Sequence, residues 1–212
     1  MKLYYLPGAC SLASHISLIW SGVDYELERL EYSTMHGEAF MSLNPKGAVP
    51  TLVMDDVAPH PFVLTESLAV LLYIAAQAPG ARLGAVEGDR IEEARMHEIM
   101  AELVSDVHKA FTPTFVPNRF VVDPNAEDDV KKAAFIQIDK AFAQLEARLN
   151  GHDWLVLDRR TVADAYLNVV CRWKVRTPTG LAAFPNLMAH HSRMAADPDV
   201  QRALAEEGLP AD

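Results

Sequence analysis

The first twenty residues, Met1–Trp20, constrain the fold most strongly. Lys2 to Leu6 is a short apolar and aromatic run, typical of a buried strand, and Pro7-Gly8 ends it. From Ser11 onward, apolar residues recur at helical spacing: Leu12, Ile16 and Ile19. The stretch therefore predicts a strand, a tight turn and a helix, with Cys10 at the point where the helix begins.

Cys10 occupies a position suited to sulfur chemistry. The unpaired backbone N–H groups and the positive dipole end of a helix N-terminus favour a thiolate. The pKa of this thiol is therefore expected below its reference value of about 8.5. The alternative is a small buried residue that only fills space, which is the commoner role of an arbitrary intracellular cysteine. The strand, turn and helix around Cys10 favour the reactive interpretation.

Composition excludes several classes of protein. The chain has 212 residues, of which 50% are hydrophobic, so it suits one large or two small domains and is too apolar for disorder. A formal net charge of −10 argues against non-specific binding of nucleic acid, a polyanion. The two cysteines, Cys10 and Cys171, cannot make a disulfide framework and have no neighbours at zinc spacing. We therefore expect no metal.

No stretch has the pattern of an export signal or a membrane span. An early Pro-Gly interrupts the N-terminus, and no run of about 18 apolar residues occurs. Because cysteine is scarce as well, the sequence predicts a cytoplasmic protein.

The next residues extend a small α/β unit. Apolar and charged residues alternate along Val23–Tyr32, as in a strand with one solvent-exposed face. A short helix through Phe40 then precedes the turn Asn44–Gly47. Further strands are expected at Ala48–Met54, closed by Asp55-Asp56 followed by Pro59 and Pro61, and at Phe62–Leu64. Because proline inside a sheet needs an edge or a special bond geometry, Val49-Pro50 is a candidate cis bond.

Thr65-Glu66-Ser67 precedes the apolar run Leu68–Ala76, which predicts a helix. Free N–H groups at its start would make an anion site. The alternative is that Glu66 and Ser67 only cap the helix.

The second half is helical throughout. Residues 79–88 are rich in Gly, Pro and Ala and are expected to be a linker between domains 1–78 and 89–212. A helix is predicted over Asp89–Phe111, ending before Pro113. Thr161–Asp164 has the form of a capping box and opens the helix Ala165–Trp173. Because that helix is apolar nearly all round, it should lie at the centre of the second domain.

These elements and five motifs in register resemble a glutathione transferase, with an α/β thioredoxin-like N-terminal domain and an all-α C-terminal domain. The motifs are Tyr5 with Pro7–Ser11, Asn44–Gly47 leading to Val49-Pro50, Glu66-Ser67, His108–Pro113 and Val162–Asp164. The cysteine after Pro-Gly-Ala and the His108-Lys109 pair resemble the bacterial beta class.

The resemblance implies a site for glutathione as co-substrate at the edge of the first domain. The backbone of Val49, held by a cis Pro50, would pair with the cysteinyl part of the tripeptide. Ser67 would receive the γ-glutamyl carboxylate, and Glu66 would meet the ammonium group. Where the beta class supplies lysines this chain has Met35-His36, so the resemblance implies that His36 would substitute for them at the glycine carboxylate.

The resemblance also implies how the thiol is activated. The glutathione thiolate would be stabilised by a cationic or hydrogen-bond-donor environment. Its members would be the Cys10 side chain, the backbone N–H of Cys10 or Ser11, and His108, with Lys109 close by. The alternative for His108 is an ordinary helix histidine. Tyr5 stands near the place where other classes use a catalytic tyrosine, and here a structural role is favoured.

Three aromatic residues could line the pocket of an apolar co-substrate: Phe111, Phe115 and Trp173. Plain core packing is the alternative for each of them.

The resulting hypothesis is a dimeric cytoplasmic glutathione transferase that conjugates small hydrophobic electrophiles, with thiol-transfer or peroxidase activity as additions. One alternative is a non-catalytic member of the fold that holds a ligand or a protein. Another is a glutaredoxin-type protein in which Cys10 turns over as a mixed disulfide.

Overall fold

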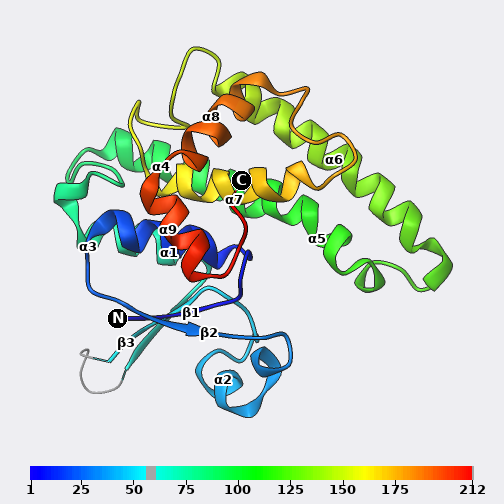
Figure 1. The fold of residues 1–212 in the computed structure, drawn as a ribbon, viewed down its shortest axis with the longest axis horizontal. Coiled ribbons are helices and arrows are strands. Elements are labelled where there is room, and N and C mark those ends of the chain that lie inside the picture. Colours follow the sequence, from blue (N-terminus) through cyan, green and yellow to red (C-terminus); the bar gives the residue numbers. More distant parts are fainter. Residues whose placement is uncertain (56–60, 212) are drawn as a thin grey trace.

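The computed structural model describes residues 1–55 and 61–211. Its first part contains a four-stranded sheet in the order β2-β1-β3-β4, and the rest is helical (Figure 1). The strands are β1 (Lys2–Tyr5), β2 (Glu26–Arg29), β3 (Thr51–Met54) and β4 (Phe62–Thr65). β1 pairs in parallel with β2, while the β1–β3 and β3–β4 pairs are antiparallel. The predicted thioredoxin-like half and the all-α half are both confirmed.

The sheet is covered on both faces because side chains alternate along β1. Leu3 and Tyr5 are buried in a cluster with residues of α1 (Ser11–Ser21) and α3 (Ser67–Gln77). Tyr4 packs instead against the cluster beneath α2 (Glu38–Leu43), where its ring lies 5.5 Å from that of Phe40. The β1–α1 turn therefore emerges at one end of the sheet with Cys10 at its tip.

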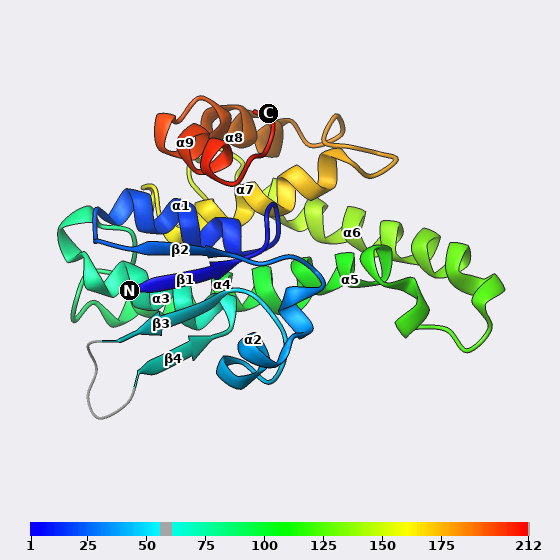
Figure 2. The same cartoon turned by 60° about the horizontal axis from the view of Figure 1, so that its bottom comes forward.

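The second half contains six further helices, among the described residues. They are α4 (Arg90–Glu102), α5 (Lys109–Phe115), α6 (Glu127–Arg148), α7 (Val162–Val175), α8 (Pro185–Ala195) and α9 (Pro198–Glu206). Short 3₁₀ turns occur at Thr34–His36, Pro79–Ala81, Pro117–Arg119 and Pro124–Ala126. In Figure 2, α5 and α6 form an arm that extends away from the sheet, while α8 and α9 lie over α7 and α1. Every residue of α7 is buried except Trp173 and Val175, which confirms its predicted central place.

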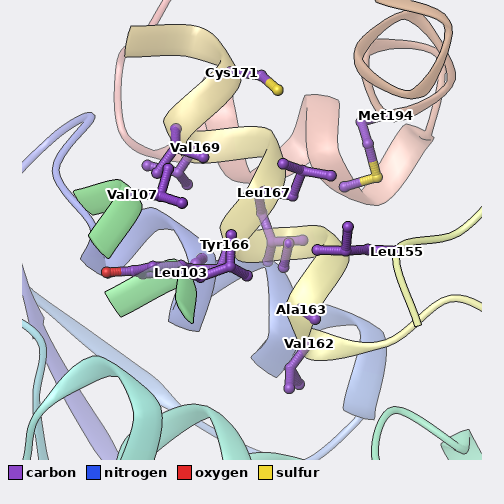
Figure 3. Packing of buried hydrophobic residues seen from close by; sticks show 14 of the residues in the cluster. Leu103, Val107, Leu155, Val162, Ala163, Tyr166, Leu167, Val169, Cys171 and Met194 are labelled. Carbon is purple, nitrogen blue, oxygen red and sulfur yellow. The ribbon is translucent and has the colours of Figure 1, made fainter. Parts of the chain in front are cut away.

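The two halves share one core. Leu12 and Ile16 of α1 belong to the same buried cluster as Phe111 and the inner residues of α7, some of which Figure 3 shows. The segment 79–88 is also hydrogen-bonded to the helical half, since Val162 N donates to Leu83 O at 2.9 Å. The boundaries at residues 78 and 89 therefore stay predictions, and the segment between them contacts the helical half.

Three boundaries differ from the sequence expectation. β2 covers Glu26–Arg29 rather than Val23–Tyr32, and most of it is exposed. β3 begins at Thr51 rather than Ala48 and ends at Met54 as predicted, while Asp56 and Pro59, two of the residues expected to close it, lie outside the described residues. The helix expected over Asp89–Phe111 contains a π-helical segment, Leu103–His108, and continues through Pro113 to Phe115. Proline removes one backbone donor, and α5 ends two residues beyond it.

Candidate active site

A pocket of about 260 Å³ opens between the end of the sheet and the helical stretch formed by α4, the π-helical segment and α5. Four segments wall it: the start of α1, the loop before β3, the β4–α3 junction and the end of the π-helical segment. Seven of the predicted site residues line it, namely Cys10, Val49, Pro50, Glu66, Ser67, His108 and Lys109. Residues separated by nearly 100 positions in the chain are thus brought to one cavity.

Cys10 lies at the inner end of this pocket as a buried thiol. Its Sγ donates to the carbonyl oxygen of Val49 at 3.2 Å, and the Val49-Pro50 bond is cis as predicted. Burial raises the pKa of the Cys10 thiol to about 11, although the Ser67 hydroxyl and the N–H groups of Cys10 and Ser11 oppose this rise. The expectation of a lowered pKa is therefore wrong, because the loss of hydration outweighs the helix N-terminus. At neutral pH, Cys10 is a hydrogen-bond donor.

This protonation state predicts the reactivity of Cys10. The rate of its alkylation by iodoacetamide in the ligand-free protein should rise about tenfold per pH unit toward pH 11, because only the thiolate reacts. Peptide-resolved mass spectrometry at a series of pH values measures this rate, and buried Cys171 serves as the internal control. A rate that levels off near neutral pH would show a thiolate and refute this assignment.

The loop that carries Cys10 is held from three sides. Gly8 has φ of +70°, a left-handed conformation that suits glycine after proline in this turn. The Gly8 carbonyl accepts from Trp173 Nε1 at 3.0 Å, and the Gly8 N–H donates to Glu207 at 2.9 Å. The Ser11 hydroxyl bonds both the N–H and the carbonyl of Leu6. This hydroxyl therefore braces the loop, and only the backbone N–H of Ser11 is left to serve a ligand.

The Glu66-Ser67 pair occupies the start of α3 in an unusual conformation. Glu66 has φ of 72°, which is sparsely populated by non-glycine residues and costs of order 1–3 kcal/mol. Neither side chain makes a cap hydrogen bond, so the capping alternative is wrong. The carboxylate of Glu66 instead meets Lys46 Nζ at 2.5 Å. The first N–H groups of α3 have no intrahelical acceptor, as at any helix start, and Glu66 and Ser67 at this junction line the pocket.

His108 is placed by the π-helical segment, a feature frequent at functional sites. Its Nδ1 lies 2.6 Å from the hydroxyl oxygen of Tyr166, and the ring centroids of His108 and Trp173 are 4.9 Å apart. Burial, helped by the positive charge of Lys109, lowers the pKa of His108 to about 4. The imidazole is consequently neutral at physiological pH, so it can donate a hydrogen bond but supplies no positive charge.

The remaining predicted residues lie around this pocket. Tyr5 is buried within the sheet cluster, its ring 6.1 Å from that of His15, and it does not line the cavity. His36 is exposed and bonds the carbonyl of Tyr32 at 3.2 Å, at the outer edge of the site. Phe111, Phe115 and Trp173 form one aromatic cluster beside His108, with centroid separations of 5.3 to 6.2 Å. Phe111 is buried core, whereas Phe115 is 53% exposed.

Sequence reasoning missed three contributors. Lys46 lines the pocket, and Asn44 anchors its loop by donating to Ala48 O at 2.8 Å and to Thr51 Oγ1 at 3.0 Å. Their motif was interpreted as a turn and as part of the family resemblance, without a role for either side chain. The lysine is its one cationic side chain, so it could have suggested an anion contact. No sequence pattern indicated a role for Tyr166 at the site, because a tyrosine on an apolar helix is expected to pack in the hydrophobic core.

Two family models match the chain. "Glutathione S-transferase, N-terminal domain" covers residues 8–77, and "Glutathione S-transferase, C-terminal domain" covers residues 103–198. Glutathione S-transferase GST-4.5 of Xanthomonas campestris pv. campestris is 39% identical over 99% of this chain and 100% of its own length. The chain belongs to the glutathione S-transferase family.

Solved structures of other glutathione S-transferases agree in fold and class. A sphingomonad enzyme complexed with glutathione is 37% identical, with a TM-score of 0.86, over 99% of this chain and 100% of that one. A bacterial beta-class enzyme from Sphingomonas chungbukensis is 35% identical, with a TM-score of 0.87 and the same coverage. The predicted resemblance to the beta class is confirmed, and the protein is a glutathione transferase whose co-substrate is glutathione.

The described residues contain neither a cluster of metal ligands nor a helix that could span a membrane. In residues 1–55 and 61–211, no three His, Cys, Asp or Glu side chains gather as metal ligands would. No described helix combines the length and the apolar character needed to cross a bilayer.

Proposed function

We propose that the pocket binds glutathione with its sulfur between Cys10 and His108. The thiolate then attacks an electrophilic carbon of a small hydrophobic molecule, such as an aromatic halide, so that a C–S bond forms and the halide leaves with the electron pair of the broken bond. The observation that carries the proposal is the convergence in one cavity of a neutral thiol, a helix N-terminus and a neutral imidazole. None of these groups brings a negative charge to the place where a thiolate must form. A thiolate beside three hydrogen-bond donors is stabilised without a counter-charge.

The tripeptide fits the pocket in one direction. The N-terminus of α3 and the Ser67 hydroxyl suit the γ-glutamyl carboxylate, and Glu66 suits its ammonium group. Val49 O accepts the single S–H of Cys10 in the free protein. In the complex, Val49 O accepts the cysteinyl N–H of glutathione, while Cys10 turns its proton to the bound sulfur. This arrangement directs the cysteinyl sulfur toward Cys10 and His108.

Lys46 is the proposed partner of the glycine carboxylate, in place of His36, because it lines the pocket. Lys46→Ala should raise the KM for glutathione roughly fivefold to tenfold and leave kcat nearly unchanged, since a contact equal in ground and transition states affects binding alone. Steady-state kinetics with varied glutathione measure both constants. Lys132→Ala is the matched control, because Lys132 is similarly exposed and paired with Asp129 at 2.9 Å on α6. Equal KM changes in both variants would contradict the assignment.

The aromatic cluster of Phe111, Phe115 and Trp173 supports the choice of electrophile. It begins at the His108 ring and ends at exposed Phe115, so an apolar molecule entering there lies next to the sulfur. Conjugation of glutathione to an aromatic halide tests the proposal. Retention on immobilised glutathione without turnover would instead favour the non-catalytic alternative.

Thiol transfer through Cys10 is the less favoured additional activity. A mixed disulfide requires the Cys10 thiolate as attacking group, and the raised pKa of Cys10 opposes its formation. Cys10→Ala should therefore reduce conjugation only modestly, by the loss of one donor.

A cytoplasmic homodimer completes the proposal. A groove of about 490 Å³ between α3 and α4, lined by accessible apolar residues such as Leu72, Ala76 and Pro79, supports association through this face. Light scattering in solution tests the oligomeric state, and a monomer at micromolar concentration would contradict it.

A further inference from the structure

The phenol of Tyr166 is a buried polar group beneath the pocket. Tyr166 is fully buried on α7, and its hydroxyl oxygen lies 2.6 Å from Nδ1 of His108. Figure 3 shows Tyr166 within the cluster that contains Leu103 and Val107, residues of the π-helical segment that ends at His108. The contact therefore joins the rigid centre of the helical half to an imidazole of the active site.

The direction of this hydrogen bond decides which nitrogen of His108 carries a proton. Burial raises the pKa of the Tyr166 hydroxyl, and the nearby Cys10 and Glu66 groups raise it further, so the phenol stays protonated. Nδ1 of His108 lies within hydrogen-bond distance of the phenol oxygen, at 2.6 Å. A buried phenol that keeps its proton donates it to such an acceptor, so the bond runs from Tyr166 to Nδ1 of His108.

We propose that Tyr166 is a positioning residue, whose phenol donates to Nδ1 of His108 and so keeps the imidazole proton on Nε2. In a neutral histidine, the bond made by one nitrogen sets the protonation of the other. Nε2–H is then a fixed donor for the glutathione sulfur, and the edge of Trp173 holds the ring from its side. This role rests on the proposed binding of glutathione, but the tautomer itself does not.

The charged and titratable groups around His108 are consistent with a neutral donor. Lys109 follows it in the chain, Cys10 faces it across the pocket as a thiol, and Glu66 at the α3 junction is engaged by Lys46. No carboxylate hydrogen-bonds His108 in the described part of the chain, so nothing there favours an imidazolium. An imidazole that stays neutral needs a fixed tautomer in order to donate reliably.

The first test uses the enzyme without glutathione. The ¹⁵N chemical shifts of His108 in the labelled enzyme should show a single neutral tautomer, protonated at Nε2. Tyr166→Phe, which removes only the hydroxyl, should give a mixture of the two tautomers. A wild-type His108 protonated at Nδ1, or a tautomer that Tyr166→Phe leaves unchanged, would overturn the proposal whether or not glutathione binds.

The second test separates positioning from a merely structural role. Tyr166→Phe should lower kcat roughly fivefold to tenfold and raise the apparent pKa of bound glutathione by up to about one unit, with little change in its KM. In the His108→Ala background the same substitution should have no further effect on either quantity. Equal losses in both backgrounds would show that the hydroxyl acts on structure alone and would overturn the proposal.

Tyr25→Phe is the matched control for these measurements. Tyr25 is a partly buried tyrosine that lines a separate groove between α1 and α9, away from the pocket of Cys10. Its hydroxyl can be removed without touching His108. This control should keep the wild-type pH profile and the wild-type His108 tautomer, and a change in either would overturn the link to Tyr166.

Discussion

His108→Ala is expected to lower the rate of conjugation about 10- to 100-fold at neutral pH. The neutral imidazole is a side-chain donor held in place by Tyr166 and Trp173, so its loss should raise the pKa of bound glutathione by about one to two units. The loss should shrink as the pH rises, because the thiolate then forms without help. The ultraviolet absorbance of the bound thiolate, followed against pH, measures this shift alongside the rate.

The pH profile also distinguishes a donor from a cation. Because burial lowers the pKa of His108 to about 4, its charge is constant above about pH 5, and the acid limb of the wild-type profile should not report its titration. His108→Gln keeps an N–H donor and should recover part of the rate. His152→Ala, at an exposed histidine paired with Asp158, is the control that should leave the profile unchanged. An unaltered thiol pKa in His108→Ala would remove His108 from the mechanism.

Asp164→Ala is expected to lower the free energy of unfolding by about 3–5 kcal/mol. The Asp164 carboxylate is fully buried at the start of α7 and receives four hydrogen bonds. Its donors are Leu155 N at 2.9 Å, Thr161 N at 2.8 Å, Thr161 Oγ1 at 3.0 Å and His190 Nε2 at 3.0 Å. Substitution by alanine leaves buried donors unsatisfied as well as removing the cap. Urea unfolding followed by circular dichroism measures the loss.

Asp89→Ala provides the comparison that isolates burial. Asp89 caps α4 by accepting from Ile91 N and Glu92 N, but it is exposed, so its loss should cost only about 1 kcal/mol. Similar destabilisation by the two substitutions would contradict the view that the buried network, rather than capping alone, makes Asp164 important.

Much of the architecture was predictable because it follows from local rules. The Pro7-Gly8 turn, the capping box at Thr161–Asp164 and the apolar circumference of α7 each have a direct physical signature in the chain. The capping box is present with both of its hydrogen bonds. The residues that gather at the pocket were predicted only through the family resemblance, since periodicity says nothing about which loops meet.

The properties that sequence reasoning missed depend on three-dimensional surroundings. The pKa of Cys10 follows from its burial beside Val49, which no spacing reveals, and this burial reversed the prediction from the helix N-terminus. The π-helical segment leaves the i, i+3 and i+4 pattern of apolar residues intact, so the helix seemed continuous in the sequence. Tyr166 acts through a residue 58 positions away, and Lys46 contributes through a turn that opens toward α3.

The position of the glutathione sulfur tests the account most directly. In a crystal structure of the complex, that sulfur should lie within about 3.5 Å of both Cys10 Sγ and His108 Nε2. The γ-glutamyl carboxylate should then lie at the start of α3. A tripeptide bound elsewhere, or a sulfur directed away from His108, would contradict the proposed mechanism.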